Sequence, residues 1–263
     1  MRTDFETMEI ERTGDDVLVV TFNRPEVRNA KNTKMGMEQK ELFEGLYVDT
    51  EGVRCVVITG KGDAFCAGGD LKERKGMTDA QWQRQHAIFE QGVLALRMCP
   101  LPVIAAVNGP AFAGGCETVL TCDFAYASTK ARFALTEVTL GIMPGAMGTQ
   151  NLPHAVGERR AKEIILTGRP FSAEEALDWG LVNKLCEPEK LMDDVMETAQ
   201  KIASNAPQSV MRAKRSISVA TQVDRFNGFQ FELEAYNRLV PLDDRQEGIN
   251  AFNEKRKPQY KGR

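Results

Sequence analysis

Two glycine-rich stretches, each following a run of apolar residues, are the parts of this sequence best suited to chemistry. The first is Phe65–Lys72 (FCAGGDLK) and the second is Asn108–Glu117 (NGPAFAGGCE). Glycine lets the backbone come close to a ligand, and the second stretch opens a predicted helix whose first N–H groups lack partners. Two such amides directed at one oxygen would form an oxyanion hole, which stabilises negative charge developing on a carbonyl.

Two glutamates stand within or after these stretches. Glu117 lies three residues after Gly114, about one helical turn, so its carboxylate can project on the same side as the Gly114 amide. From position alone, a glutamate that caps the helix start and complements its dipole is the commoner interpretation. Glu137 is the only charged residue between Arg132 and Glu158, and such an acid is either exposed on a loop or held in a site. Burial raises the pKa of a carboxylic acid, as a general acid requires.

Composition and the remaining motifs exclude several kinds of site. The formal net charge is −3 and the pI is about 5.7, so nothing indicates a nucleic-acid partner. Neither glycine stretch has a phosphate-loop or dinucleotide fingerprint. The two histidines, His86 and His154, stand near no cysteine and in no catalytic context, which disfavours a zinc site and a Ser-His-Asp triad. We therefore expect no metal and no redox cofactor.

The cysteines and the first residues favour a cytoplasmic protein. None of the apolar runs approaches the roughly 18 residues of a membrane span, so we expect no membrane partner. The N-terminal residues carry acids and lack the apolar core of a signal peptide. The 6 cysteines form no C-x-x-C pair and mostly stand in apolar runs, which predicts reduced, buried thiols.

The elements that must position the glycines and glutamates alternate between strand and helix. Apolar runs that end in turn residues predict strands at 16–22, 54–59, 103–107, 123–127 and 132–135. Helical spacing predicts helices at 33–48 and 79–98. From about residue 145 the pattern is almost wholly helical, with helices expected at 145–155, 158–167, 173–179, 188–204, 207–221, 226–239 and 243–254. The plan is an α/β core followed by a helical C-terminal part.

Taken in order, these motifs closely resemble those of the enoyl-CoA hydratase/isomerase (crotonase) superfamily over almost the whole chain. The matching segments are Asn23–Ala30, Gly60–Lys72, Pro102–Gly109, Gly114–Glu117, Phe133–Gly148, Leu166–Arg169 and Ala176–Val182. The resemblance implies a crotonase-like spiral of ββα units over residues 1–200, which holds CoA and the active site. It also implies a C-terminal helical region, residues 201–263, that assembles a homotrimer or a dimer of trimers.

The resemblance assigns roles to the chemically suited residues. It places the amides of Gly69 and Gly114 in the oxyanion hole and matches Glu117 and Glu137 to the two acids of the hydratases. This assignment replaces the capping interpretation of Glu117. We interpret Glu137 as the acid and Glu117 as the base in adding water across the 2-trans double bond of an enoyl-CoA. Gly69 stands where many hydratases have alanine, a change that matters little for a backbone contact.

For CoA binding, the resemblance implies backbone contacts along a cleft and two cations near the phosphates. The residues are Arg28, Ala30, Ala67, Gly69, Asp70, Leu71, Lys72 and Gly114. Arg28 and Lys72 are the cations, although a solvated surface position explains each equally well. Lys31 departs from the family, which usually has an apolar residue there near the CoA adenine, and a cation at that edge could favour a phosphate. CoA is part of the substrate, so no separate cofactor is expected.

The acyl pocket is expected from residues 73–98 and 140–150. Within these ranges, Met77, Trp82, Met143 and Met147 are either adaptable lining residues or ordinary core. Possession of both glutamates favours a hydratase over other reactions of the superfamily. The alternatives are an enoyl-CoA isomerase, a methylglutaconyl-CoA or aryl-enoyl-CoA hydratase, and a non-catalytic, RNA-binding member, which the acidic pI disfavours.

Overall fold

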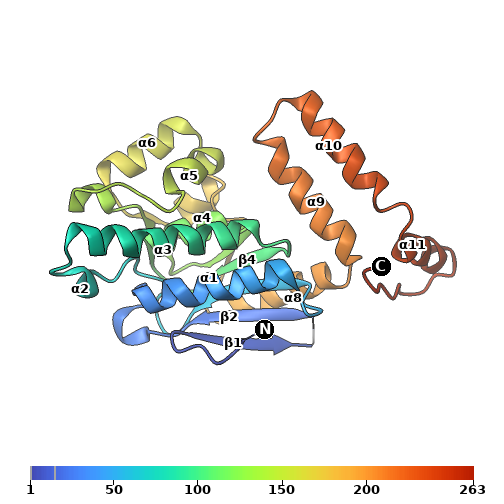
Figure 1. Cartoon of the computed structure of the whole chain (residues 1–263), viewed down its shortest axis with the longest axis horizontal. Helices are drawn as coiled ribbons and strands as arrows, with labels where there is room; N and C mark the ends of the chain where they lie inside the picture. The colour runs from blue at the N-terminus through green and yellow to red at the C-terminus, as the bar shows by residue number, and fades with distance from the viewer. Residues whose placement is uncertain (1, 15) are drawn as a thin grey trace.

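The computed structural model describes residues 2–14 and 16–263, and its central feature is a sheet with strand order β1-β2-β3-β4-β6-β9 (Figure 1). These strands are β1 (Met8–Thr13), β2 (Val17–Phe22), β3 (Cys55–Gly60), β4 (Val103–Val107), β6 (Phe124–Ser128) and β9 (Lys184–Cys186). β1 and β2 pair antiparallel, and all the other neighbours in this sheet pair parallel. Parallel pairs need long crossovers, and here most of the crossovers contain helices.

A second, smaller sheet has the order β5-β7-β8. Its strands are β5 (Ala111–Phe112), β7 (Arg132–Ala134) and β8 (Phe171–Ser172). Two isolated bridges, Lys31 with Gly69 and Cys66 with Ala111, continue this row of short pairings toward the N-terminus. The chain therefore visits the long sheet and the short row in turn, as the expected spiral of repeated units requires.

Helices cover both faces of the long sheet and then extend away from it. Those of the core are α1 (Thr33–Val48), α2 (Leu71–Arg74), α3 (Asp79–Met98), α4 (Gly114–Thr121), α5 (Gly148–Val156), α6 (Glu158–Thr167), α7 (Ala173–Asp178) and α8 (Leu191–Ala203). Two 3-10 turns, η1 (Pro25–Val27) and η2 (Glu137–Leu140), complete the core. α1 and α3 pack against each other on one side of the sheet, and α8 packs on the other (Figure 1).

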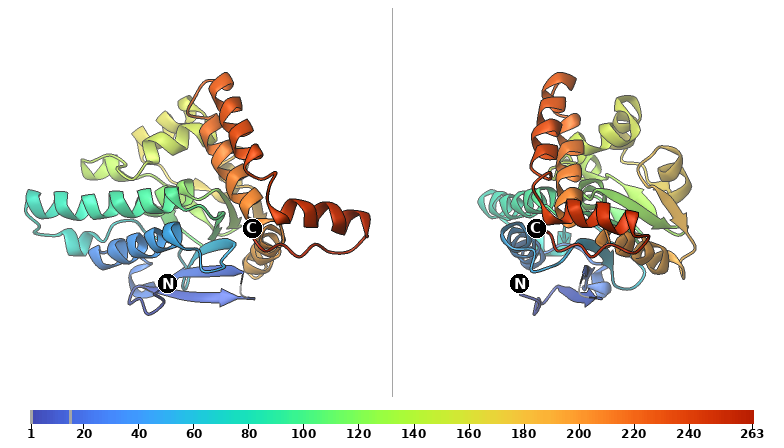
Figure 2. Two further views of the ribbon diagram at one scale, coloured as in Figure 1. Left: turned by 45° about the vertical axis from the view of Figure 1, so that its right-hand side comes forward. Right: turned by 90° about the vertical axis from the view of Figure 1, so that its right-hand side faces the viewer.

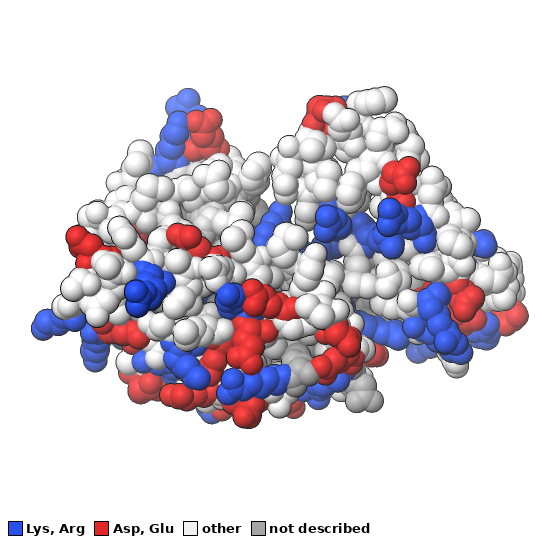
Figure 3. All heavy atoms as spheres, in the orientation of Figure 1, with Lys and Arg blue, Asp and Glu red and all other residues white. Residues whose placement is uncertain are grey.

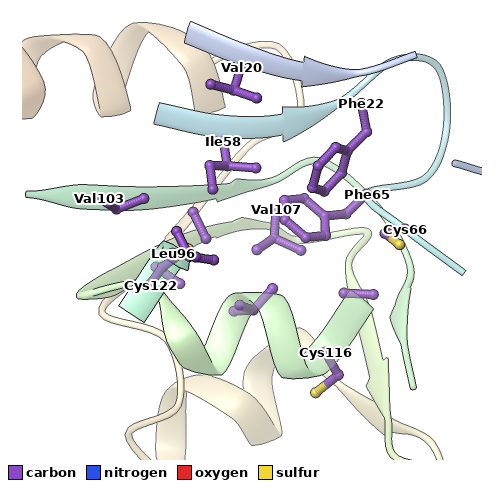
Figure 4. Close-up of a cluster of buried hydrophobic side chains, with 14 of the residues drawn as sticks. Val20, Phe22, Ile58, Phe65, Cys66, Leu96, Val103, Val107, Cys116 and Cys122 are labelled. Atoms are coloured by element: carbon purple, nitrogen blue, oxygen red, sulfur yellow. The ribbon is translucent and has the colours of Figure 1, made fainter. Parts of the chain in front are cut away.

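The two sheet faces supply two buried clusters because side chains alternate along each strand. Val20, Ile58 and Val107 point into the larger cluster, where the rings of Phe22 and Phe65 meet edge to face with their centroids 5.7 Å apart (Figure 4). The intervening residues, including Val19 and Val57, face Val195 and Ala199 of α8. The strand runs are therefore buried on both faces, as parallel sheets require.

The last three helices extend from this core. They are α9 (Pro207–Ala220), α10 (Arg225–Asn237) and α11 (Asp243–Asn253). α9 contacts the core through Met211 and Lys214. α9 and α10 pack as a hairpin that projects from the sheet, and α11 lies at its base on the outer side (Figures 1 and 2). Neither α9 nor α10 has a fully buried residue, and charged groups are sparse on much of the exposed surface of α10 (Figure 3).

The α/β plan predicted from the sequence is confirmed, and the helices at 33–48 and 79–98 and the strand at 103–107 match to the residue. The region beyond residue 145 is not wholly helical, because β8 and β9 interrupt it. Strands of two or three residues are too short to show a period of two. β1, an edge strand with mostly exposed side chains, was likewise not predicted.

The cysteines agree with the prediction, since all 6 are buried and unpaired. Over residues 2–14 and 16–263, none of the helices is long and apolar enough to cross a membrane. The same residues bring together no group of three or more His, Cys, Asp or Glu side chains that could hold a metal ion.

Candidate active site

The two glycine-rich stretches meet next to the start of α4, and Gly68 makes their contact possible. Gly68 has φ +92°, and a Cβ on it would stand 2.7 Å from the Cβ of Ala113 and 3.3 Å from the Gly114 nitrogen. Only glycine combines this backbone conformation with so close an approach. Ala113 itself has φ +48°, a strained value that positions the first turn of α4. The contact brings Gly69 and Gly114 into the wall of one cavity.

The amides of Gly69 and Gly114 are free to bind a ligand. Neither N–H has an acceptor among the residues that the structure describes, whereas the neighbouring Lys31 and Asp70 amides bond to Gly68 and Lys31 carbonyls at 2.7 and 2.9 Å. Gly114 is the first residue of α4, so its N–H also lies at the positive end of that helix dipole. Two free donors in one cavity wall are the arrangement that an oxyanion hole needs.

The cavity has a volume of about 540 Å³. Its walls come from the two glycine stretches, α1, α3, η2 and the loop that follows η2. Both ranges predicted for the acyl pocket, 73–98 and 140–150, contribute lining residues. Trp82 and Met143 line the cavity, whereas Met77 and Met147 lie outside the lining.

Glu117 projects from the first turn of α4 into this cavity and is only 3% exposed. Its Oε1 accepts hydrogen bonds from the main-chain N–H groups of Ala146 and Gly148, at 2.8 and 2.9 Å. Burial raises the pKa of Glu117, and these two amides partly oppose that effect because they stabilise the ionised form. The role considered for Glu117 in capping its own helix is absent, since its carboxylate bonds to Ala146 in the loop before α5 and to Gly148, the first residue of α5.

Glu137 begins η2, lines the same cavity and is 7% exposed. Its Oε2 is buried without a hydrogen-bond partner among the described residues. Burial, followed by the charge of Glu117, raises the pKa of Glu137 to about 7. The position that could have been an exposed loop acid is therefore a buried acid that holds its proton near neutral pH.

The pair can carry out coupled proton transfer. One carboxyl group has hydrogen bonds that favour the ionised form, and the other is held protonated by its surroundings, so one can accept a proton while the other donates one. The Glu117 Oε2 lies 3.9 Å from where a Cβ on Gly114 would stand, which puts the carboxylate beside the free Gly114 amide. A carbonyl oxygen bound by that amide would therefore lie close to Glu117.

Four of the residues expected to bind CoA line the cavity, namely Ala67, Gly69, Leu71 and Gly114. Ala67 and Leu71 are exposed, as residues at the mouth of a cleft would be. Their apolar atoms and main-chain groups can contact a ligand without a charged side chain.

The remaining expected CoA-binding residues do not line the cavity. Arg28 and Lys72 have exposed side chains, and Ala30 is buried. The Asp70 carboxylate accepts a hydrogen bond from Arg24 Nη1 at 2.9 Å and from the Lys72 and Glu73 amides, so it caps α2. Burial opposes these bonds, but together they lower the pKa of Asp70. Its role is to hold the wall that presents Gly69.

Lys31 is not the cation at the CoA edge that the sequence suggested. Its side chain is 6% exposed, and its Nζ donates to Gln39 Oε1 at 3.0 Å and to Thr118 Oγ1 at 2.6 Å. The side chain therefore turns inward to the cavity, because its position in the bridge with Gly69 directs it under the first glycine stretch.

Sequence reasoning missed Gly36 and Gln39 in the cavity wall, and it did not single out Arg74 within the range 73–98 predicted for the acyl pocket. Gln39 could have been found, because it lies four residues after Met35 and three before Leu42, on the apolar face of the helix predicted at 33–48. Arg74 gave no signal, since it stands in a charged run that reads as ordinary surface.

Comparisons with known proteins agree with this geometry. The family model described as enoyl-CoA hydratase/isomerase matches residues 12–263. The short-chain-enoyl-CoA hydratase of Clostridium acetobutylicum is 41% identical over 242 residues, 92% of this chain and 92% of that protein. The mitochondrial enoyl-CoA hydratase of Pongo abelii is 36% identical over 98% of this chain and 89% of its own. A crystal structure of enoyl-CoA hydratase from Bacillus anthracis, 41% identical, superposes with a TM-score of 0.96 over 98% of this chain and 100% of its own.

Proposed function

Since the chain belongs to the enoyl-CoA hydratase/isomerase family, we propose that it adds water reversibly across the 2-trans double bond of an enoyl-CoA thioester. One observation carries the proposal: Glu117 and Glu137 line the same cavity as the free amides of Gly69 and Gly114. Burial raises the pKa of both glutamates, but two main-chain amides oppose this effect at Glu117, whereas the Glu137 Oε2 has no hydrogen-bond partner among the described residues. A hydratase needs a base for water, an acid for the α-carbon and donors for the thioester oxygen, and this cavity contains all of them.

The reaction begins when the thioester oxygen accepts hydrogen bonds from the Gly69 and Gly114 amides. These bonds withdraw electrons from the conjugated double bond and make the β-carbon electrophilic. The oxygen gains negative charge as water attacks, so the amides bind the transition state more tightly than the substrate. Loss of one such donor typically raises the barrier by about 3–4 kcal/mol.

Proton transfer completes the addition. The Glu117 carboxylate accepts a proton from the attacking water, and the protonated Glu137 donates a proton to the α-carbon. The C–O bond forms at the β-carbon, the C–H bond forms at the α-carbon, and the two acids finish with their protons exchanged. A proton must then pass from Glu117 back to Glu137, and solvent at the cavity mouth can carry it.

The rest of the substrate extends out of the cavity. We propose that the CoA moiety passes Ala67 and Leu71 at the mouth, where Arg28 and Lys72 are exposed and can approach its phosphates. We also propose that the α9–α10 hairpin associates with further copies of the chain, because neither helix has a buried residue of its own.

The test follows the ultraviolet absorbance of the conjugated thioester in crotonyl-CoA and trans-2-hexenoyl-CoA with purified protein. Hydration removes the conjugation, so the absorbance falls, and mass spectrometry detects a product heavier by one water. A double-bond shift would also remove the conjugation but leave the mass unchanged. An unchanged absorbance with every unsubstituted and substituted enoyl-CoA tested would rule out the proposed reaction.

A further inference from the structure

Two basic side chains line the acyl cavity together with the two glutamates. They are Lys31 and Arg74, and neither forms an ion pair with an acid among the residues that the structure describes. The water-addition chemistry uses neither of them. Glu117 interacts electrostatically with Lys31, and Glu73 with Arg74, but neither acid contacts its cation directly. Each cation can therefore still take an anionic ligand, which would offset the cost of removing its charge from water.

Arg74 presents an open pair of donors to this cavity. Its Nε donates to Gln85 Oε1 at 2.8 Å, and its guanidinium carbon lies 4.3 Å from the ring centroid of Trp82 and 5.5 Å from that of Phe89. The aromatic contacts and the Gln85 bond restrain the group. Its Nη1 and Nη2 have no acceptor among the described residues, so both remain available to a ligand.

The Arg74 guanidinium lies next to the place where the thioester would bind. Its carbon stands 3.2 Å, and its Nη1 3.3 Å, from where a Cβ on Gly69 would be. An alanine at residue 69 would crowd this group, whereas glycine leaves room for it. An anion bound to Arg74 would therefore lie within a short acyl chain's reach of an oxygen held by the Gly69 amide.

Lys31 adds positive charge under the same wall. Two hydrogens of its ammonium group bond to Gln39 and Thr118, and the third has no acceptor among the described residues. Thr118 lies four residues beyond Gly114 on α4, a rise of about 6 Å, so the ammonium group is also close to the oxyanion donors. Burial lowers the pKa of Lys31, and a bound anion would restore its preference for the charged form.

A methyl-terminated acyl chain would leave these donors without a partner once it displaced the water around them. A carboxylate on the acyl chain would instead pair with the Arg74 fork through charge-assisted, bidentate hydrogen bonds. Sites built for such groups reject analogues that lack them, because the polar groups of the site are then buried unpaired.

We propose that the acyl group of the substrate carries a carboxylate of its own, which Arg74 binds, so that the enzyme selects dicarboxylic enoyl-CoA thioesters over methyl-terminated ones of the same length. This inference rests on the proposed hydratase function. It adds the substrate class and a specificity-determining residue.

The experiment compares 2,3-dehydroadipyl-CoA with trans-2-hexenoyl-CoA, which have equal acyl length and differ in a terminal carboxylate or methyl group. The wild-type kcat/KM ratio of the two should exceed about 10 in favour of the dicarboxylic thioester. In Arg74→Met the ratio should fall by about 100-fold, mostly through KM of the dicarboxylic substrate. Arg74→Lys keeps the charge but loses the fork, so it should recover only part of the ratio. Arg84→Met, an exposed arginine on α3, is the matched control and should leave the ratio at its wild-type value.

A second variant covers the case in which Arg74→Met does not fold. Lys31→Met removes the other cation and should also lower the ratio, by about 10-fold. The ammonium group of Lys31 attracts the substrate carboxylate electrostatically, but Arg74 makes most of the direct contact with it. A wild-type preference for trans-2-hexenoyl-CoA, or an equal loss on both substrates in Arg74→Met, would overturn the inference while leaving the hydratase function intact. Failure to hydrate either thioester would instead refute the hydratase function itself.

Discussion

Glu117 and Glu137 line one cavity but have opposite hydrogen-bonding surroundings. The Glu117 Oε1 accepts two main-chain N–H bonds, whereas the Glu137 Oε2 is buried without any partner among the described residues. Hydrogen bonds from amides stabilise an ionised carboxylate, and burial without them stabilises the neutral acid. The difference supports the proposed roles of Glu117 as the base and Glu137 as the acid.

Replacement of the acid is the most direct check of this assignment. Glu137→Gln keeps the size of the side chain but cannot donate a proton to the α-carbon, so kcat for hydration should fall by about 10²- to 10⁴-fold. Because the substitution removes a buried ionisable group, folding should be preserved, which circular dichroism can verify. Glu189→Gln, on an exposed segment before α8, serves as the control. Full activity of Glu137→Gln would contradict the role of Glu137 as the acid.

The pH dependence should report the two carboxyl groups as a coupled pair. Hydration requires Glu137 protonated, and its pKa is raised to about 7 by burial and by the charge of Glu117, so kcat/KM should fall as pH increases through about 7. Hydration also requires Glu117 ionised, so kcat/KM should fall again as pH decreases. Because burial raises the pKa of Glu117, this acidic decline should begin at a higher pH than for an ordinary glutamate.

The profile of kcat/KM against pH should therefore be bell-shaped, and Glu137→Gln should lose the alkaline limb because no proton remains to be lost there. Glu197→Gln, an exposed carboxylate on α8, should keep both limbs. If the alkaline limb persisted in Glu137→Gln, another group would have to be the acid.

The sequence predicted the parts of this site that depend on local pattern. Glycine at residues 68 and 69, buried strands before the two loops and an isolated Glu137 are all visible in one dimension. The direction of the Lys31 side chain could not be predicted from the sequence. It depends on the bridge with Gly69, which is a contact between segments far apart in the chain. The partnerless oxygen of Glu137 is likewise a product of tertiary packing.

The close contact at Gly68 predicts that a single methyl group will disturb the amides. In Gly68→Ala the new Cβ would meet Ala113 Cβ at 2.7 Å and the Gly114 nitrogen at 3.3 Å, at a residue with φ +92°. The two loops must then move apart, so kcat should fall by about 10²- to 10³-fold, the loss typical of one oxyanion donor. Steady-state kinetics on crotonyl-CoA measures the effect.

Gly157→Ala separates backbone strain from displacement of the amides. Gly157 has φ +81° and ψ 152° but no atom within 4 Å of a Cβ built on it, so the substitution should cost about 1–3 kcal/mol of stability and little activity. Equal kinetic losses in the two variants would mean that strain alone, and not the position of the Gly114 amide, accounts for the defect in Gly68→Ala.

The α10 helix carries an apolar stripe that the single chain leaves uncovered. The residues Phe226, Phe229, Leu233 and Tyr236 recur at intervals of three and four, which places them on one face of the helix, and they are 69, 51, 39 and 63% exposed. Apolar surface of this extent in a projecting hairpin is typical of an interface.

Burial of this stripe between copies of the chain predicts a self-associated protein that separates when charge is added to it. Phe229→Glu combined with Leu233→Glu would place carboxylates in an apolar contact, where an unpaired charge costs several kcal/mol. Sedimentation equilibrium should then show the mass of one chain instead of a multiple of it, whereas Asn227→Glu, exposed on the side of α10 away from the stripe, should keep the wild-type mass. A wild-type protein with the mass of one chain at micromolar concentration would show that α9 and α10 are stable without a partner, and the stripe would need another explanation. Because the lining of the cavity includes no residue of α9 or α10, the separated chains should retain the two glutamates and both free amides in place.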